Sequence, residues 1–546
     1  MRVYVAAAAL LVIFFCELFF ASAVKSPAWD EPGHISSGVA YVQLGSLAVN
    51  PQHPPLLKAL SGLGLTLSGG KWPNIPEAQA LLNGDARWQW DIGSLMLYKA
   101  GLDRALMWAR MPMMLVGIMG GLVLFLWARQ LAGPPAAIAA LMLYVLDPTI
   151  VGHSFLVTLD VGLGAFSLLF LFCLWNYVRT SSQVWMTASG IALGMALCTK
   201  FSSIVLLPVG GVLWLAGSLT FEKPAPVKKK GARPAEERAQ PRWRAPLSGV
   251  WILAIAAVIV MLIYRFQGFS YIEGATKVNA DHVEGYKAYM AGDLAPNFSS
   301  YFAVAYLLKE PLAAIALAAL GLFLVVRGKL AARDKLFLIV PPVALFAIHV
   351  WKADDLGIRY IIPCLPFAHL LGGIALAELF RGQMWMRVAA AAACVWVVMA
   401  AAGIYPDGLS YFNESACLLN DPKMLGLDGG SRCGVAWLDD SNLDWGEGLK
   451  QLQAWMEQNA KGRTARLVYF GSFRPGAYES LAVEQMSPED TFFRPPPGLY
   501  AVSAHIVAHN TALVRHGDAA GDEWMQRLPP RAIVGHCLYI YDIPAK

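Results

Sequence analysis

Several ionisable side chains in this sequence border long apolar stretches, where charges are costly. The carboxylates Asp30 and Glu31 directly follow the first such stretch, and Asp160 begins another. The cations Lys200 and Arg359 lie at the ends of later ones. A carboxylate there could remove a proton from a hydroxyl group, and cations could hold a phosphate and neutralise charge on a leaving group. Further candidates near apolar boundaries are His34, His53, Arg110 and Arg265, the two arginines being the weaker phosphate ligands.

Each main candidate also has a simpler interpretation. Asp30 precedes Pro32, so on this motif alone a helix cap is the favoured role. Asp160 could stabilise the positive end of a helix dipole, which is its favoured role when it is considered alone. Lys200 and Arg359 could extend their charged ends to the membrane surface. Residue type and spacing therefore leave catalysis open at this point.

The elements that position these residues are hydrophobic helices. Of 546 residues, 57% are hydrophobic and 15% are charged, whereas a soluble domain has about 25% charged residues. Spanning a bilayer takes about 20 apolar residues, and such runs recur. The pattern predicts a polytopic α-helical membrane protein with about eleven transmembrane helices, at residues 4–24, 105–127, 134–150, 156–178, 184–200, 203–220, 247–266, 302–326, 336–350, 358–380 and 387–404.

Basic residues predict the orientation. Lysines and arginines concentrate in residues 223–244 and 327–335, between predicted spans, and short basic loops stay in the cytoplasm. With an odd number of spans, the N-terminus is expected in the cytoplasm and the C-terminus outside. The acidic and cationic candidates then share the extracytoplasmic side. The position of the basic runs between spans favours topology over nucleic-acid binding, so no nucleic-acid partner is predicted.

Two regions lie outside the predicted membrane domain of residues 1–404 or interrupt it. The first exported loop, 25–104, is expected to hold short helices at 35–44 and 55–63, and a cytoplasmic linker is expected at 221–246. The tail, 405–546, is long enough for an extracytoplasmic α/β domain. Its pattern predicts strands at 434–438, 466–470, 498–504 and 537–543, and a helix at 446–458 capped by Asp444. Cys417 and Cys433 could form a disulfide there.

Taken together, these motifs resemble the GT-C glycosyltransferases. The features that support this resemblance are the Asp-Glu pair after the first helix, the long first loop, Asp160, and Thr199-Lys200 at a helix end. The most similar branch is glycosyltransferase family 39, the protein O-mannosyltransferase and lipid A aminoarabinose transferase group. Further matching motifs are His53-Pro54-Pro55-Leu56-Leu57-Lys58, Tyr306-Leu307-Leu308-Lys309-Glu310-Pro311, Arg359-Tyr360-Ile361-Ile362-Pro363 and, as in uncharacterised bacterial members, Asp440-Ser441-Asn442-Leu443-Asp444-Trp445-Gly446.

The resemblance implies inverting sugar transfer from a polyprenyl-phosphate donor to a hydroxyl of a protein, lipid or glycan, in a GT-C fold. By this resemblance Asp30 is the expected base, with Glu31 as its neighbour and less favoured substitute. Asp160 and His53 are expected at the acceptor site. Lys200 and Arg359, with Arg110 and Arg265, are expected to contact the donor phosphate.

The resemblance leaves the cofactor open. A divalent metal is compatible with the sequence but not required, and no residue is assigned as a ligand. His34 and His53 are possible ligands, although a structural role is favoured for both. The expected location is the bacterial inner membrane, with the C-terminal domain in the periplasm. Two other functions fit the composition: a lipid-linked glycan transporter or flippase, and a non-catalytic envelope scaffold. No inverted repeat typical of many transporters is evident.

Overall fold

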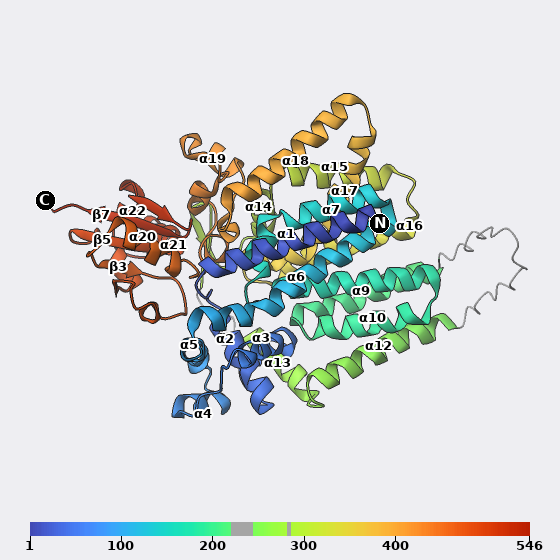
Figure 1. The fold of residues 1–546 in the computed structure, drawn as a ribbon, viewed down its shortest axis with the longest axis horizontal. Coiled ribbons are helices and arrows are strands. Elements are labelled where there is room, and N and C mark those ends of the chain that lie inside the picture. The colour runs from blue at the N-terminus through green and yellow to red at the C-terminus, as the bar shows by residue number, and fades with distance from the viewer. Residues whose placement is uncertain (220–243, 281–285, 546) are drawn as a thin grey trace, which may run out of the picture.

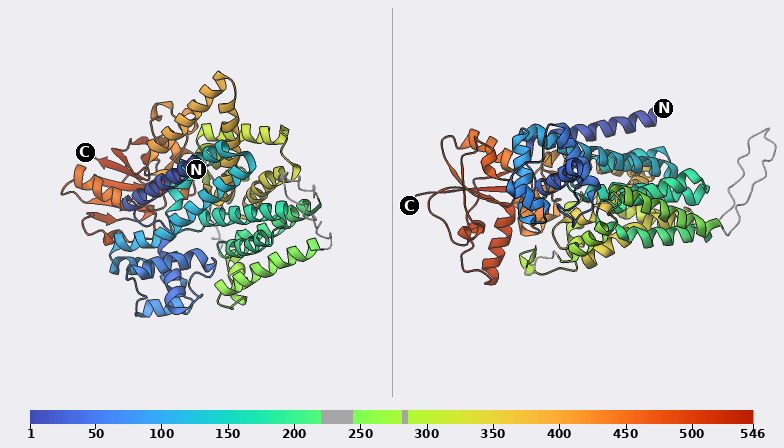
Figure 2. Two further views of the ribbon diagram at one scale, coloured as in Figure 1. Left: turned by 45° about the vertical axis from the view of Figure 1, so that its right-hand side comes forward. Right: turned by 90° about the horizontal axis from the view of Figure 1, so that it is seen from below.

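The computed structural model describes residues 1–219, 244–280 and 286–545. Its larger part is a bundle of long helices that run in roughly the same direction (Figure 1). The N-terminus lies at one end of the bundle, and the C-terminal sheet region lies against the other end (Figures 1 and 2). The helices of the first loop lie together on one side of this second end (Figure 1). The predicted class, a polytopic helical membrane protein with a C-terminal α/β region, is confirmed.

The bundle consists mainly of apolar helices. Six single helices are long and apolar enough to cross a membrane: α1 (Arg2–Val24), α6 (Leu102–Ala132), α9 (Asp160–Thr180), α16 (Ala332–Lys352), α17 (Leu365–Arg381, preceded by the 3₁₀ turn η4, Ile358–Cys364) and α18 (Met384–Ile404). Shorter apolar helices lie beside them: α10 (Gln183–Leu197), α11 (Leu206–Leu219, preceded by η3, Phe201–Val205) and α12 (Arg244–Ile263).

Two further spans are bent pairs. Helices α7 (Pro134–Val145) and α8 (Pro148–Ser154) meet at 62°, and α14 (Tyr301–Lys309) and α15 (Leu312–Arg327) meet at 113°. Each break contains a proline, Pro148 or Pro311, which cannot donate the next helical hydrogen bond. All eleven predicted ranges thus correspond to a helix or a bent pair, and six single helices and two pairs meet the length criterion for crossing. That α10, α11 and α12 also cross stays a prediction.

The first loop forms helices beside the bundle end, as predicted for residues 35–44 and 55–63. They are α2 (Glu31–Val39), continued by the π turn η1 (Ala40–Leu44), then α3 (Pro55–Leu67), α4 (Pro76–Leu82), the 3₁₀ turn η2 (Ala86–Trp88) and α5 (Gln89–Lys99). Gly38 and Gly62 sit where α2 crosses α3, and a Cβ atom on Gly38 would lie 1.9 Å from the Lys58 carbonyl oxygen. Only glycine permits this approach. Helix α13 (Phe269–Ala280) and the hairpin β1 (Ala288–Met290) and β2 (Asp293–Ala295) follow the bundle helix α12.

The tail folds around a five-stranded sheet in the order β4-β3-β5-β7-β6. Strand β5 (Gly498–Ser503) pairs parallel with β3 (Ala465–Val468) and antiparallel with β7 (Leu538–Ile543), while the short β4 (Val483–Gln485) and β6 (Ala532–Val534) form the edges. The helices of this region are α19 (Ser415–Leu418), α20 (Leu449–Asn459), α21 (Ala504–His516) and α22 (Trp524–Arg527).

Three predicted strands of the tail are confirmed, and one is wrong. Residues 431–436 form the 3₁₀ turn η7 (Ser431–Ala436), because Gly434 packs tightly against the Phe412 ring and the segment joins no ladder of the sheet. The helix predicted at 446–458 is α20, but Asp444 does not cap it; its carboxylate accepts a hydrogen bond from the Gly446 amide, ahead of the helix. The Cys417–Cys433 disulfide is present. Most of the predicted linker, 221–246, lies outside the described residues.

A buried charge network joins the tail to the bundle. Lys25, just after α1, pairs with Asp407 at 2.8 Å, and His536 of the β6–β7 turn contacts Asp407 at 2.8 Å and Asp428 at 3.1 Å. Burial alone would lower the pKa of His536. The two carboxylates outweigh this effect and raise the pKa of His536 to about 9. The imidazole is therefore charged at neutral pH and bridges two acidic side chains.

This bridge predicts a pH-dependent stability. Because the folded pKa of His536 exceeds its unfolded value, its contribution is fully present below about pH 6.5 and is lost as the pH rises through about 9. We expect the melting temperature of the wild-type protein in detergent to fall across this window more than that of a His536→Gln variant. Parallel profiles for the two proteins would contradict the bridge.

Candidate active site

The site is built on a buried ion pair at the start of α2. The Glu31 carboxylate accepts hydrogen bonds from the Arg110 guanidinium at 2.5 and 2.9 Å, and from the backbone amides of Ala28 and Val157, both at 2.8 Å. Both side chains are fully buried. Arg110, on α6, also donates to the carbonyl oxygens of Ser22, Lys25 and Ser26. These contacts fix the first turn of α2 against α6 and against the segment that follows α1.

Asp30, the preceding residue, points the other way. Its carboxylate caps no backbone amide of α2, so the helix-cap interpretation is not supported. Instead, Oδ2 accepts a hydrogen bond from the Arg359 guanidinium at 2.9 Å. The Asp30 side chain is 29% exposed, in contrast to the fully buried Glu31. Of the two neighbouring carboxylates, only Asp30 is therefore available to a substrate.

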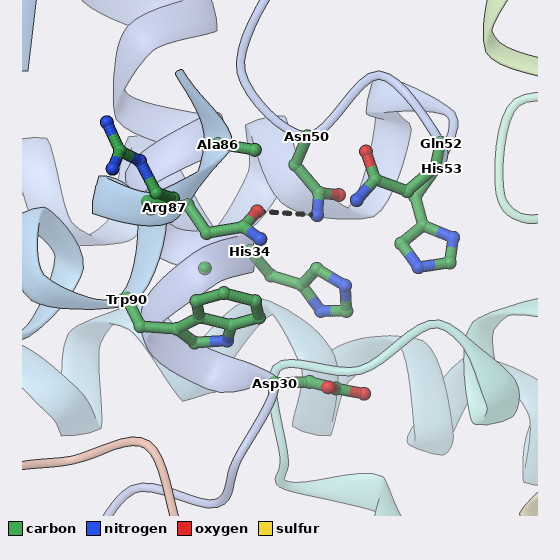
Figure 3. A pocket seen from close by; sticks show the side chains of 10 residues that line it. Asp30, His34, Asn50, Gln52, His53, Ala86, Arg87 and Trp90 are labelled. Carbon is green, nitrogen blue, oxygen red and sulfur yellow. Dashed lines mark hydrogen bonds between the residues drawn. The ribbon is translucent and has the colours of Figure 1, made fainter. Parts of the chain in front are cut away.

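Asp30 lines a cavity of about 440 Å³ between α2, α5 and the loop before α3. His34 and His53 also line it, with their rings 5.3 Å apart and nearly perpendicular. In Figure 3, the side chains of Asp30, His34 and His53 extend toward the same side of the cavity. Burial is the main cause that lowers the pKa of both imidazoles, and nearby positive groups lower that of His53 further. Both histidines are therefore neutral at pH 7. Asp30 is the one carboxylate among the described residues that line the cavity.

A second acid–cation pair lies beside the first. The Lys200 ammonium, after α10, contacts the Asp160 carboxylate at the start of α9 at 2.7 Å. The same ammonium lies 4.2 Å from the centre of the Tyr360 ring, next to Arg359. Asp160 also lies within electrostatic range of Arg359. Four sequence-distant candidates, Asp30, Asp160, Lys200 and Arg359, thus gather at one end of the bundle as two matched pairs.

The tail contributes directly to this region. The Arg359 guanidinium lies 4.3 Å above the centre of the Trp445 ring, and the Trp445 carbonyl oxygen accepts a hydrogen bond from the Trp29 amide at 2.8 Å. Trp445 is almost completely buried. Trp445 and Tyr360 lie in motifs that carry the resemblance, but the sequence predicts no role for either residue. The signal that could identify them is the need of a buried cation for an aromatic face beside it.

The geometry corrects two of the predicted assignments. Glu31 is not a substitute base, because its carboxylate is fully buried and occupied by four donors. Arg110 is not a phosphate ligand, because its guanidinium is committed to Glu31 and to backbone carbonyl groups. Arg265 is exposed and contacts Tyr41, both through a hydrogen bond to its carbonyl and over its ring, and its assignment as a phosphate ligand stays a prediction. His53 lines the cavity together with Asp30, whereas Asp160 is not among the lining residues, and the contact of either with an acceptor stays a prediction.

In the part of the chain that the structure describes, potential metal ligands cluster near this region but not at Asp30 or Asp160. Within the described residues, two groups of three or more potential ligands lie close enough to share an ion, namely Asp439, His505 and His509, and Asp147, Glu310 and His369. Neither group includes Asp30 or Asp160, each of which is paired with a cation. The side chains at this site thus offer carboxylates that can accept a proton and cations that can hold an anion.

Comparison with known proteins finds a family match to part of the chain. Residues 102–228 match the family described as dolichyl-phosphate-mannose-protein mannosyltransferase, a segment that includes α6 to α11 with Asp160 and Lys200. This match confirms the resemblance to GT-C glycosyltransferases of the protein O-mannosyltransferase type that the sequence motifs indicated. The chain is thus similar to membrane-bound enzymes that transfer sugars. No curated protein matches the sequence.

Two of the solved structures that align with this chain do so over most of its length at low sequence identity. ArnT from Cupriavidus metallidurans bound to undecaprenyl phosphate aligns with a TM-score of 0.49 at 14% identity, over 98% of this chain and 97% of that one. The oligosaccharyltransferase AglB from Archaeoglobus fulgidus, in complex with an inhibitory peptide and a dolichol-phosphate, aligns with a TM-score of 0.45 at 10% identity, over 96% and 72%.

The buried pair predicts a strong effect on stability. Glu31→Gln keeps the shape of the side chain but leaves the Arg110 charge buried without its counter-ion, a change that typically costs about 3–5 kcal/mol. We expect little folded protein on size-exclusion chromatography in detergent and a much lower melting temperature. Asp85→Asn is the matched control, because it breaks an exposed ion pair with Arg87 and should leave folding unchanged. Normal folding of the Glu31 variant would contradict the anchoring role.

Proposed function

We propose that this protein is an inverting glycosyltransferase that moves a sugar from a polyprenyl-phosphate donor to a hydroxyl acceptor. The observation that carries the proposal is the position of Asp30. Its carboxylate is the accessible acid of a polar cavity and lies 2.9 Å from a cation, Arg359, that could bind the departing phosphate. A carboxylate base that takes a proton and a cation that stabilises a leaving anion are the two groups this reaction needs.

In the proposed reaction, Asp30 accepts the proton of the acceptor hydroxyl. The acceptor oxygen then forms a bond to the anomeric carbon as the bond from that carbon to the phosphate oxygen breaks. The electron pair of the broken bond leaves with the lipid phosphate, next to Arg359 and Lys200. The neutral His34 and His53 can hydrogen-bond acceptor or sugar hydroxyl groups without competing for the phosphate.

The two acid–cation pairs explain how the site stays stable before substrate binds. Buried charges are costly unless they are paired. Asp30 neutralises Arg359, and Asp160 neutralises Lys200, at 2.9 and 2.7 Å. A donor phosphate can replace the carboxylates as the partner of the two cations. That exchange releases Asp30 to act as a base only when the donor is present.

The family match supports the donor class, since the family name specifies a lipid-phosphate sugar and a protein acceptor. We propose a protein, lipid or glycan hydroxyl as acceptor and leave the sugar as a hexose or pentose. The tail, whose Trp445 contacts Arg359, would cover the site and help select the acceptor.

We further propose that the site faces the periplasm of a bacterial inner membrane. Arginines and lysines gather at the opposite end of the bundle, where α6, α9, α15 and α17 end and α16 and α18 begin: Arg129, Arg179, Arg327, Lys335, Arg381 and Arg387. This distribution supports a cytoplasmic location for that end. The buried tail disulfide is consistent with an oxidising compartment on the side of the site.

The central variant is Asp30→Asn, which keeps the size of the side chain and its hydrogen bond to Arg359 but removes the base. Loss of a general base typically slows a reaction by about 100- to 10,000-fold. The assay measures release of polyprenyl phosphate from lipid-linked sugars of the native membrane, using the full-length protein in proteoliposomes. Asp293→Asn, at an exposed position of β2, serves as control and should retain full activity.

Two outcomes would contradict the assignment. Full turnover by folded Asp30→Asn would mean that another group takes the proton. Movement of lipid-linked sugar between leaflets without release of polyprenyl phosphate by the wild-type protein would indicate a transporter.

The cations are tested separately. Arg359→Lys keeps the charge but loses the planar fork, and Arg359→Gln loses both. We expect kcat/KM for the donor to fall on the order of tenfold and 100-fold respectively, because charged hydrogen bonds contribute about 1.5–3 kcal/mol. KM for the acceptor should change much less. Equal effects on both substrates, or no difference between the two variants, would argue against a phosphate contact.

A further inference from the structure

The tail contains a second polar cluster, next to the candidate active site but separate from it. Asp439 is completely buried, and its Oδ2 lies 3.3 Å from Nδ1 of His505 and 3.0 Å from Nδ1 of His509. The two histidines are four residues apart on α21, so they present their rings on one helix face. The three ligand atoms lie within 4.8 Å of one another.

These distances suit a shared ion. With metal–ligand bonds of about 2.0–2.1 Å, ligand atoms at the corners of a tetrahedron lie about 3.4 Å apart. Two imidazoles and one carboxylate are a common ligand set for zinc in sites that keep one open position. Magnesium and calcium prefer oxygen ligands alone, so the two imidazole nitrogens favour a transition-metal ion.

The contacts around Asp439 leave its carboxylate incompletely satisfied. Nδ1 of His505 lies 3.3 Å from Oδ2 of Asp439 and 3.2 Å from the Asp440 backbone nitrogen. The other carboxylate oxygen, Oδ1, is buried and has no hydrogen-bond partner within the part of the chain that the structure describes. A bound cation would pair with this carboxylate, and the Nδ1 lone pair would then point to the cation rather than to the amide.

Aromatic rings hold the two histidines in position. The Phe470 ring stacks on His505 with a centroid distance of 3.9 Å, and the His505 and His509 rings stack at 5.2 Å. The Tyr286 ring stacks on His509 at 6.0 Å. Both imidazoles are thus fixed with Nδ1 directed at Asp439 before any ion arrives, which lowers the entropic cost of binding.

We infer that Asp439, His505 and His509 form a binding site for a zinc-class transition-metal dication. The fourth position is filled by water or by another small ligand. The site ties α21 to the segment that begins at Asp439 and continues to Trp445, whose ring supports Arg359. The ion therefore has a positioning role: it orders this segment where the tail meets the end of the bundle. The importance of this positioning role for sugar transfer rests on the proposed function, whereas binding of the ion does not.

Metal binding is measured on the purified full-length protein after removal of metals with a chelator. We expect Zn²⁺ titration followed by elemental analysis to give about one tightly bound ion per chain that depends on this cluster. His509→Gln and Asp439→Asn should each lower the affinity by at least about tenfold, since even loss of an outer partner of a metal ligand costs 10- to 100-fold. His516→Gln, at an exposed histidine of the same helix, is the matched control and should bind like the wild type.

Two further readouts keep the inference falsifiable if a variant is poorly folded. Co²⁺ in place of Zn²⁺ should give the visible absorption of a low-coordinate nitrogen–oxygen site in the wild type and His516→Gln, but not in folded His509→Gln. Zn²⁺ should raise the melting temperature of the same two proteins only. Wild-type affinity or an unchanged Co²⁺ spectrum in His509→Gln would overturn the inference, as would a wild-type protein that binds no ion.

Discussion

The buried pair between Glu31 and Arg110 is the interaction on which the site depends. An uncompensated charge at this depth costs several kcal/mol, so the two side chains must remain together. Because Glu31 is held by four donors, the backbone around it has one position, and Asp30 must project to the opposite side. The pair thus links α1, α2, α6 and the amide of Val157, and it converts two adjacent acids into one structural and one accessible carboxylate.

Around this fixed point, the charges of the site are balanced within the protein. Asp30 with Arg359 and Asp160 with Lys200 form two ion pairs that the bundle can enclose without stray charge. Aromatic faces of Tyr360 and Trp445 hold the cations. In the proposed reaction, an incoming donor phosphate would meet a site whose positive groups are already oriented, and its binding would require only an exchange of partners. Such preorganisation is a major source of catalytic stabilisation.

Much of this arrangement could be predicted from the sequence. Long apolar runs gave the helices, and the ends of those runs identified Asp30, Asp160, Lys200 and Arg359, because charged groups at membrane depth are restricted to such places. The partner of Glu31 could not be predicted from the sequence, because Arg110 lies 79 positions away and becomes its neighbour only through helix packing. For the same reason Arg110 and Arg265 looked like equivalent cations, although one is buried in an ion pair and the other is exposed.

In the tail, local pattern and tertiary context disagree. Residues 434–438 have the composition of a strand, but close packing of Gly434 against Phe412 leaves them outside the sheet. The spacing of His505 and His509 is visible in the sequence, whereas Asp439 reaches them from 66 residues away at the nearest. Contacts of this kind are set by topology, which a single sequence does not specify.

The central claim is that a donor phosphate replaces Asp30 as the partner of Arg359. Equilibrium binding of polyprenyl phosphate to the purified protein tests it most directly. If the two anions compete, Asp30→Asn removes the competing charge, so it should bind polyprenyl phosphate at least as tightly as the wild type, while Arg359→Gln should bind more weakly. Weaker binding by folded Asp30→Asn, or unchanged binding by Arg359→Gln, would contradict the account.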